Sequence, residues 1–418
     1  MQKRIMKLTI YLLIFILSFL NCSTAYNVEE DTDYSVEEII QTVSNSTDNL
    51  EISSGYAIAF DRGSKSVIWG KSENTQVPMA STTKIMTAIV LLEHCKDLSV
   101  EVEVCKEAAS IGGSRLGLKT NDKITMNDLL YGLMLCSGND AATQIAVSIG
   151  GSVEQFAKMM NAKAGELGLS HTNFTSPHGL DNPMHYTTAY ELAIITDYAL
   201  NIDKIAEVVN TKNYTVTING YEKTITNTNE LLGYLEGVNG VKTGFTNGAG
   251  RCLVTSVNRN GFNIIVVVLG ANTKKIRTKD SIKIINYIYE NYELVNIEEK
   301  ILERYNMWEQ INEKRIVINK GVQNNIQTIL GDIKIKFYPI KKGDIKDLNI
   351  QIENINYLEA PVGKDFIVGK IKVCLGEKEI QNINIYNKDK IDKKSIYEYM
   401  KQFVEIINNP LKYNLTSY

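Results

Sequence analysis

The stretch PMASTTKIMTA, residues 78–88, places a hydroxyl at Ser81 and an amine at Lys84 inside an apolar run. Its helical periodicity, without an internal proline or glycine, predicts that the two side chains project from one face of a helix's first turn. A lysine that accepts a proton must be neutral, and burial beside another cation lowers a lysine pKa from about 10.4 towards 7–8. The pair indicates a serine nucleophile with a lysine base, although the same spacing is also met where a serine caps a helix and a lysine reaches solvent.

Composition excludes several classes of function. The 418 residues suffice for two or three domains, and 44% hydrophobic with 22% charged residues is typical of a globular protein. A net charge of −3 gives no basis for a nucleic-acid partner. Beyond Cys22 the cysteines form no C-x-x-C pair, so we expect free buried thiols, no zinc knot and no cofactor, while a Cys95–Cys105 bridge stays open.

The N-terminus has the pattern of an export signal. Three basic residues among the first seven precede an uncharged apolar run, 8–20, and a small-residue site, 23–25. This predicts a secretory signal peptide, residues 1–25, cleaved after Ala25. The run is short for a membrane span, which needs about 20 apolar residues, and an uncleaved anchor is the alternative. We therefore expect the protein outside the cytoplasm, at the outer face of the cytoplasmic membrane or in the cell wall.

The next segment, residues 26–52, is acidic. It carries eight Asp or Glu between Asn27 and Glu51 and no Lys or Arg. Because such a composition buries little apolar surface, we expect a solvated spacer.

Residues 53–295 have the pattern of one α/β domain of the α+β kind. A helical block, about 82–200, separates two groups of strands, and the apolar run 264–269 predicts a central strand covered on both faces. Apolar spacing from Ile282 predicts a closing helix. An antiparallel sheet assembled from both ends of the domain, with a helical subdomain between, is expected. The predicted strands are 56–60, 66–69, 214–218, 221–225, 252–257 and 262–269.

The remaining chain reads as a small all-β domain, 296–390, followed by an amphipathic helix and tail, 391–418. Alternating apolar residues predict strands, and Gly, Asn and Lys separate them. Ile396, Met400 and Phe403 lie on one helical stripe. That helix either docks on the β domain or lies in the plane of a membrane, and both alternatives stay open. The predicted strands are 315–318, 333–337, 348–352 and 366–373.

Two further motifs follow the first in order. Ser137-Gly138-Asn139 lies in LMLCSGNDAATQIA, and Lys242-Thr243-Gly244 lies in GVNGVKTGFTNGAG, directly before a predicted hairpin. Serine–lysine penicillin-recognising enzymes carry S-x-x-K, S-x-N and K-T-G in this order.

The resemblance extends past the motifs. GSRLGLK, SPHGLDNPMHYTTA and AGRCLVTSVNRNG, at 113–119, 176–189 and 249–261, resemble the D-alanyl-D-alanine carboxypeptidases, the low-molecular-mass penicillin-binding proteins of peptidase family S11. This resemblance covers about 55–294. EAPVGKDFIVGKIKV, 359–373, is similar to the β domain that follows in that family.

The resemblance implies a role for each motif residue in acylation. Ser81 would form the acyl-enzyme and Lys84 would be its general base. Ser137 would relay the proton to the leaving D-alanine nitrogen, and Asn139 would hold Lys84 and the substrate backbone. Lys242 would be the second cation that keeps Lys84 neutral.

It also implies how the substrate would be held. Thr243 would bind the terminal carboxylate, and Gly244 would let the substrate lie along the strand edge. The backbone N–H groups of Ser81 and Phe245 would form the oxyanion hole.

A fixed cation for the free carboxylate is also implied, and Arg277 is the candidate. The alternative is a structural arginine paired with Asp280. Asn239 stands where the family more often has an acid, and Phe245 stands where some members have a polar residue. These departures affect substrate preference rather than the reaction.

The expected partners are a peptidoglycan pentapeptide stem ending in D-Ala-D-Ala, β-lactams as acylating inhibitors, and peripherally the membrane. A class A β-lactamase would need a glutamate between the second and third motifs. Residues 170–182 contain no Glu-x-x-Leu-Asn, so penicillin should acylate Ser81 and stay. A zinc carboxypeptidase using His171, His178, Asp181 and His185 is disfavoured because the spacing is not that of a helical metal pair. A catalytically idle wall-binding module is the third alternative.

Overall fold

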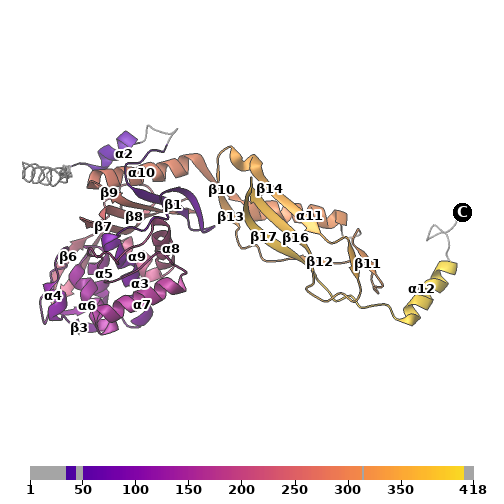
Figure 1. Cartoon of the computed structure of the whole chain (residues 1–418), viewed down its shortest axis with the longest axis horizontal. Helices are drawn as coiled ribbons and strands as arrows, with labels where there is room; N and C mark the ends of the chain where they lie inside the picture. Colours follow the sequence, from indigo (N-terminus) through magenta and orange to yellow (C-terminus); the bar gives the residue numbers. More distant parts are fainter. Residues whose placement is uncertain (1–33, 44–49, 313–314, 409–418) are drawn as a thin grey trace, which may run out of the picture. The chain divides into compact units, whose positions relative to one another are not determined.

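The computed structural model describes residues 34–43, 50–312 and 315–408, so the predicted signal peptide lies outside the described residues (Figure 1). The chain divides into two compact units. The first takes the chain up to Ile58 together with 70–257 and 266–284, and the second takes 59–69, 258–265 and the chain from Ile285 onward.

A five-stranded sheet carries the predicted site. Its order is β2-β1-β9-β8-β7, so strands from both ends of the sequence lie together and β9 is central. The apolar run 264–269 is fully buried within β9, as its composition predicts. The α/β class and the sheet built from both ends are therefore confirmed. The strands are β1 (Tyr56–Asp61), β2 (Ser66–Lys71), β7 (Val238–Thr246), β8 (Gly250–Arg259) and β9 (Phe262–Ala271).

A helical block fills the middle of the first unit. Its central helix, α3 (Lys84–His94), has every residue from Lys84 to Leu91 buried and packs against α5, α6, α7 and α8. Burial on all sides explains why the sequence around Ile85 is apolar all round rather than on one stripe. The surrounding helices are α4 (Lys106–Ser110), α5 (Met126–Met134), α6 (Asn139–Gly150), α7 (Val153–Glu166), α8 (Ala189–Ala199) and α9 (Asp203–Val209).

Two small antiparallel strand pairs, one of them a hairpin, accompany this block. β5 (Asn213–Ile218) and β6 (Tyr221–Thr226) pair antiparallel and meet at Asn219-Gly220, where both residues have positive φ. This is the two-residue turn that an Asn-Gly pair favours, because both positions require positive φ. A shorter pair joins β3 (Glu101–Glu103) to β4 (Lys123–Thr125).

The predicted acidic spacer is wrong for residues 34–43. A helix, α2 (Val36–Val43), forms there and buries Ile39 and Val43. Its acidic residues lie on the opposite face or in its first turn, where they suit the positive end of the helix dipole. The acidic composition of residues 26–52 as a whole did not indicate the short amphipathic helix within it.

The second unit contains more helix than its sequence pattern suggested. α10 (Lys274–Asn291), which begins in the first unit and ends in the second, is the predicted closing helix, but α11 (Ile297–Asn312) was not predicted. α11 buries Ile301, Tyr305 and Trp308 in the apolar core of the second unit. The charged residues between these positions, together with weak apolar periodicity, obscured the helix.

Four strands of this unit form a sheet of order β12-β17-β16-β14. The predicted strand 333–337 is wrong, because the chain there is irregular until β13 begins at Phe337. The remaining predicted strands overlap observed ones. The strands are β10 (Tyr292–Asn296), β11 (Val317–Asn319), β12 (Thr328–Leu330), β13 (Phe337–Lys341), β14 (Leu348–Asn354), β15 (Tyr357–Glu359), β16 (Ile367–Leu375) and β17 (Lys378–Asn387).

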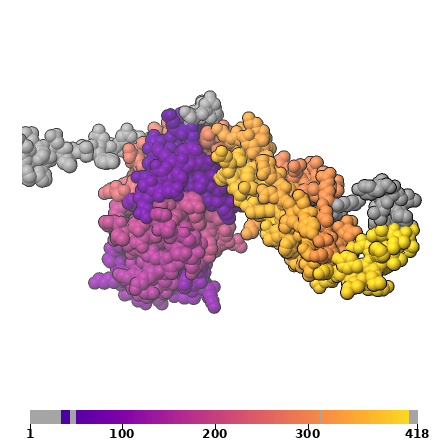
Figure 2. All heavy atoms as spheres, turned by 45° about the vertical axis from the view of Figure 1, so that its right-hand side comes forward, coloured from indigo at the N-terminus to yellow at the C-terminus, as the bar shows by residue number. Residues whose placement is uncertain are grey.

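The last described helix, α12 (Ile396–Asn408), has no buried residue. Its apolar stripe is exposed, with Met400 and Phe403 each 64% accessible, and the helix is yellow in Figure 2. None of its described side chains is buried against the β domain. Within the described part of the chain, no helix is both long and apolar enough to span a membrane.

Candidate active site

Ser81 and Lys84 lie at the start of the central helix. Ser81 belongs to a short 3-10 turn, η1 (Ala80–Thr83), and Lys84 is the first residue of α3. Lys84 Nζ lies 2.8 Å from Ser81 Oγ. The expected contact is present, although the serine occupies a tighter turn than a regular first α-turn.

Three acceptors surround the Lys84 amine. Besides Ser81 Oγ, Nζ lies 2.7 Å from Asn139 Oδ1 and 3.0 Å from the His178 carbonyl oxygen. Asn139 Nδ2 donates to the Gly112 carbonyl, which leaves its Oδ1 facing Lys84. A neutral amine has two N–H bonds and one lone pair, so Asn139 and His178 can take both N–H groups. The lone pair then remains for the Ser81 hydroxyl, as a general base requires.

Burial and a neighbouring cation favour this neutral form. Lys84 is fully buried, and desolvation, followed by the Lys242 charge, holds its pKa well below the ordinary value. Burial, with a smaller contribution from Arg277, lowers the pKa of Lys242 to about 7. Lys242 Nζ donates to the Thr243 carbonyl at 3.1 Å.

Asp140, which the sequence analysis did not single out, anchors the loop beside the second motif. Its carboxylate accepts the backbone N–H groups of Leu116, Gly117 and Leu118 and is fully buried. This is the same loop that supplies the Gly112 carbonyl to Asn139. An acidic residue in the first turn of α6, directly after the motif, is the sequence signal that could have identified it.

Strand β7 approaches η1 closely at Gly244. A Cβ at this position would lie 3.1 Å from the Ser81 backbone nitrogen and 3.2 Å from Ala80 Cβ. The resemblance implies that this glycine gives the substrate access along the strand. The structure adds that the missing side chain lets the strand lie against the backbone of the nucleophile.

Gly244→Ala is therefore expected to push β7 away from Ser81 by a few tenths of an ångström and to slow penicillin acylation by about tenfold, since small displacements of reacting groups are costly. Stopped-flow labelling would measure the rate. Gly165→Ala, in a helix where a Cβ would meet nothing within 4 Å, is the matched control. Equal rates for both variants would show that this contact is unimportant.

The four residues of the zinc alternative have other contacts. His185 Nε2 pairs with Thr83 Oγ1 at 2.8 Å, and Asp181 accepts the Gly248 N–H at 3.0 Å. His171 lies against Glu191, 3.4 Å away, and His178 Nδ1 accepts the Leu180 N–H at 3.2 Å. Among the described residues no group of three or more His, Cys, Asp or Glu is placed to hold a metal ion.

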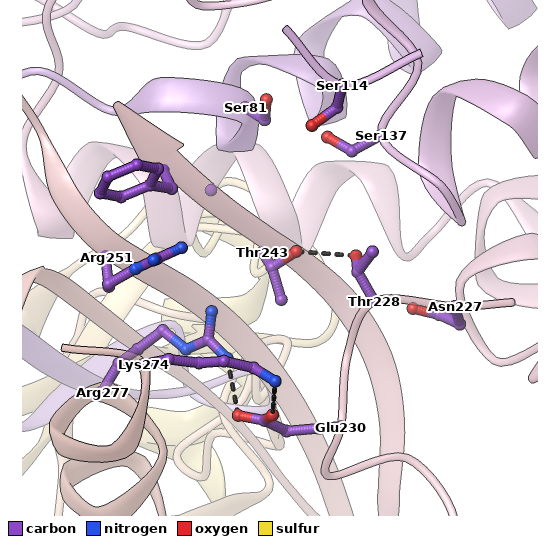
Figure 3. A pocket seen from close by; sticks show the side chains of 12 residues that line it. Ser81, Ser114, Ser137, Asn227, Thr228, Glu230, Thr243, Arg251, Lys274 and Arg277 are labelled. Carbon is purple, nitrogen blue, oxygen red and sulfur yellow. Dashed lines mark hydrogen bonds and ion pairs between the residues drawn. The ribbon is translucent and has the colours of Figure 1, made fainter. Parts of the chain in front are cut away.

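A cavity of about 450 Å³ opens beside the nucleophile. Figure 3 shows Ser81 and Ser137 on one side, with Thr243 between them and a group of charged residues. Thr243 Oγ1 pairs with Thr228 Oγ1 at 2.7 Å. The lining residues are Ser81, Ser114, Ser137, Asn227, Thr228, Glu230, Thr243, Gly244, Phe245, Arg251, Lys274 and Arg277.

Arg277 lines this cavity. The alternative prediction, in which Arg277 pairs with Asp280, is wrong. Its guanidinium forms an ion pair with Glu230 at 2.7 Å, whereas the Asp280 carboxylate accepts hydrogen bonds from Ser54 and the Ser53 backbone. Glu230 was missed because it lies outside the three motifs and 47 residues from its partner.

Cys136, beside Ser137, is half-buried rather than a core thiol. Its Sγ donates to the Gly132 carbonyl, and burial raises its pKa. It is therefore no competing nucleophile. Cys95 and Cys105 are both free, so the bridge between them does not form.

A fully buried lysine contacts a serine at the edge of a cavity, and this arrangement has the geometry expected of a serine–lysine acyl-enzyme site. Residues 41–273 match the family model described as D-alanyl-D-alanine carboxypeptidase, and 314–393 match that of the penicillin-binding protein 5 C-terminal domain. The chain belongs to the D-alanyl-D-alanine carboxypeptidase family.

Individual relatives agree with this assignment. D-alanyl-D-alanine carboxypeptidase DacF of Bacillus subtilis is 30% identical over 351 residues, covering 83% of this chain and 88% of that protein. D-alanyl-D-alanine carboxypeptidase of Streptomyces sp. K15 is 37% identical over 250 residues, covering 56% and 85%. The solved structure of penicillin-binding protein 5 from Haemophilus influenzae aligns with a TM-score of 0.68 at 26% identity, covering 83% of this chain and all of that one.

Proposed function

We propose that this protein is a serine-type D-Ala-D-Ala carboxypeptidase that removes the terminal D-alanine from peptidoglycan pentapeptide stems. The observation that carries the proposal is the Ser81–Lys84 pair, in which a fully buried amine lies 2.8 Å from the hydroxyl and its N–H groups have other acceptors. Family membership supports the substrate class.

In the first half of the reaction, Lys84 takes the proton of Ser81 as Oγ attacks the penultimate D-alanine carbonyl. The backbone N–H groups of Ser81 and Phe245 stabilise the oxyanion, each such donor contributing about 10²–10³ in rate. Ser137 passes the proton to the departing D-alanine nitrogen as the amide bond breaks. Asn139 keeps Lys84 in place. Water then hydrolyses the ester and frees Ser81.

The other end of the substrate is bound by the charged part of the cavity. Thr243 and Arg277 bind the terminal carboxylate, while Lys242 holds the pKa of Lys84 down. β-Lactams acylate the same serine, and the absence of a Glu-x-x-Leu-Asn segment in 170–182 argues for a persistent adduct.

The test is mass spectrometry of a synthetic pentapeptide ending in D-Ala-D-Ala after incubation with residues 26–418. Loss of one alanine, unaffected by a chelator, is expected. An intact peptide would contradict the carboxypeptidase, and chelator-sensitive loss would favour metal-dependent hydrolysis instead.

We also propose that the exported protein contacts the outer face of the membrane through α12. The exposed apolar residues Ile396, Met400, Phe403 and Ile407 lie on one helical stripe with no protein partner that buries them, which suits an in-plane interfacial helix.

Replacing Phe403 by Asp is expected to reduce co-sedimentation with anionic lipid vesicles by about tenfold, because it places a charge in the apolar stripe. The matched control is Lys401→Asp, off the stripe, for which a smaller, salt-dependent loss is expected. Equal losses would indicate binding by charge alone, and no binding by the unaltered chain would contradict the membrane contact.

A further inference from the structure

An acidic residue, Glu230, lies at the carboxylate-binding end of the cavity. Glu230 Oε1 lies 2.7 Å from Arg277 and Oε2 lies 2.9 Å from Lys274 Nζ (Figure 3). Thr278 Oγ1 donates to it as well. Although burial alone would raise its pKa, the Arg277 charge and these hydrogen bonds lower it, so Glu230 is ionised at neutral pH.

A fourth donor to Glu230 comes from the far N-terminal side of the chain. The Tyr34 hydroxyl donates to Oε1 at 2.7 Å, and Lys274 Nζ lies 5.4 Å from the centre of the Tyr34 ring. Tyr34 precedes α2, which is anchored by the buried Ile39 and Val43, and it lies outside the residues matched to the family model. The segment expected to be a solvated spacer therefore contacts Glu230, a residue that lines the cavity, although Tyr34 itself does not line it.

These contacts use both oxygens of the Glu230 carboxylate. Tyr34, Arg277 and Thr278 donate to Oε1, and Lys274 lies against Oε2. Glu230 therefore already has two cationic partners, Arg277 and Lys274. Its contacts hold the neighbouring side chains in place.

Arg277 depends on Glu230 both for its counter-charge and for its orientation. It is 3% accessible, and its Nε has no hydrogen-bond partner, so the Glu230 carboxylate is its anion and its orienting contact. A buried guanidinium that loses its anion is strongly disfavoured and would reorient. Glu230 also offsets one of the two positive charges of Lys274 and Arg277, and with Arg251 the cavity keeps a net positive lining for a substrate carboxylate.

We infer that Tyr34 and Glu230 are positioning residues for recognition of the substrate's terminal carboxylate by Arg277, an inference that rests on the proposed function. The N-terminal segment holds Glu230 through Tyr34, and Glu230 fixes the guanidinium. Because the substrate carboxylate is bound in both the ground state and the transition state, losing this support should raise KM and leave kcat nearly unchanged.

The test compares two substrates on the unaltered chain and on Tyr34→Phe and Glu230→Gln. One peptide ends in D-Ala-D-Ala with a free carboxylate, and the other ends in the corresponding carboxamide. For the free acid, Tyr34→Phe should raise KM about threefold to tenfold, as expected for one lost hydrogen bond to a charged group. Glu230→Gln should raise it further. For the carboxamide, kcat/KM should be unchanged.

Tyr198→Phe is the matched control, because the Tyr198 hydroxyl donates to Glu93 at 2.6 Å and neither residue lines the cavity. It should leave both substrates unaffected. Two outcomes would overturn the inference, provided that the unaltered chain releases D-alanine. In one, Tyr34→Phe lowers kcat/KM equally for the acid and the amide; in the other, it changes kcat/KM for neither. If the unaltered chain releases no D-alanine, the proposed function fails and the inference with it.

Discussion

Ser81→Ala is expected to lower D-alanine release by about 10⁴–10⁶-fold, because removing the nucleophile of a covalent mechanism eliminates the acyl-enzyme altogether. The site offers no replacement nucleophile of similar geometry. Lys84 Nζ lies beside Ser81 Oγ, and the nearby Cys136 thiol has a raised pKa. Release of D-alanine would be followed with a coupled D-amino-acid assay.

The fold should survive this substitution. Within the described residues, the Ser81 hydroxyl hydrogen-bonds only to Lys84. The turn is held instead by the Thr82 and Thr83 hydroxyls, which donate to the carbonyls of Met79 and Ala80. Ser99→Ala, on an exposed loop, is the control and should keep full activity. Substantial turnover by Ser81→Ala would mean that another residue or a water carries the attack.

Lys84→Met is expected to reduce acylation by about 10³-fold or more, a loss at the scale of a general base. Methionine keeps the apolar volume but removes the lone pair that faces Ser81. Stopped-flow measurement with a fluorescent penicillin would give the acylation rate. Lys163→Met, outside the cavity and paired with Glu93, should have no effect on that rate.

The same substitution has a second consequence, for stability. The pKa of Lys84 is depressed in the folded chain, so between that value and about 10.5 the unfolded chain binds more protons than the folded one. Stability contributed by this group therefore rises with pH across the window and falls as pH drops. Lys242, with its pKa near 7, acts in the same direction. Urea unfolding at several pH values should show a shallower rise in Lys84→Met, and an unchanged slope would contradict a buried neutral amine.

Sequence spacing predicted the structure best where the residues concerned are close together along the chain or follow a regular apolar pattern. Ser81 and Lys84 are three residues apart, and one helical turn alone brings them together. The apolar run 264–269 could only be a strand buried on both faces. Asn139 was placed beside Lys84 by resemblance, since nothing in a spacing of 55 residues specifies that contact.

The sequence could not predict contacts between residues that are far apart along the chain and lie outside the three motifs. The His178 carbonyl that completes the surroundings of Lys84 is a backbone atom, which no residue type signals. Glu230 and Tyr34 are 196 residues apart, and their pairing is set by how α2 packs. Helix α11 was missed because charged residues weaken its apolar stripe, and burial of Trp308 in the tertiary core stabilises it instead.

The central claim is that Ser81 is an acylated nucleophile activated by Lys84. Its most direct test is to incubate residues 26–418 with penicillin, digest the protein and map the adduct by tandem mass spectrometry. The account predicts one persistent adduct with the mass of the intact antibiotic, attached to Ser81 and absent from Ser81→Ala. An adduct on any other residue, or none, would contradict it.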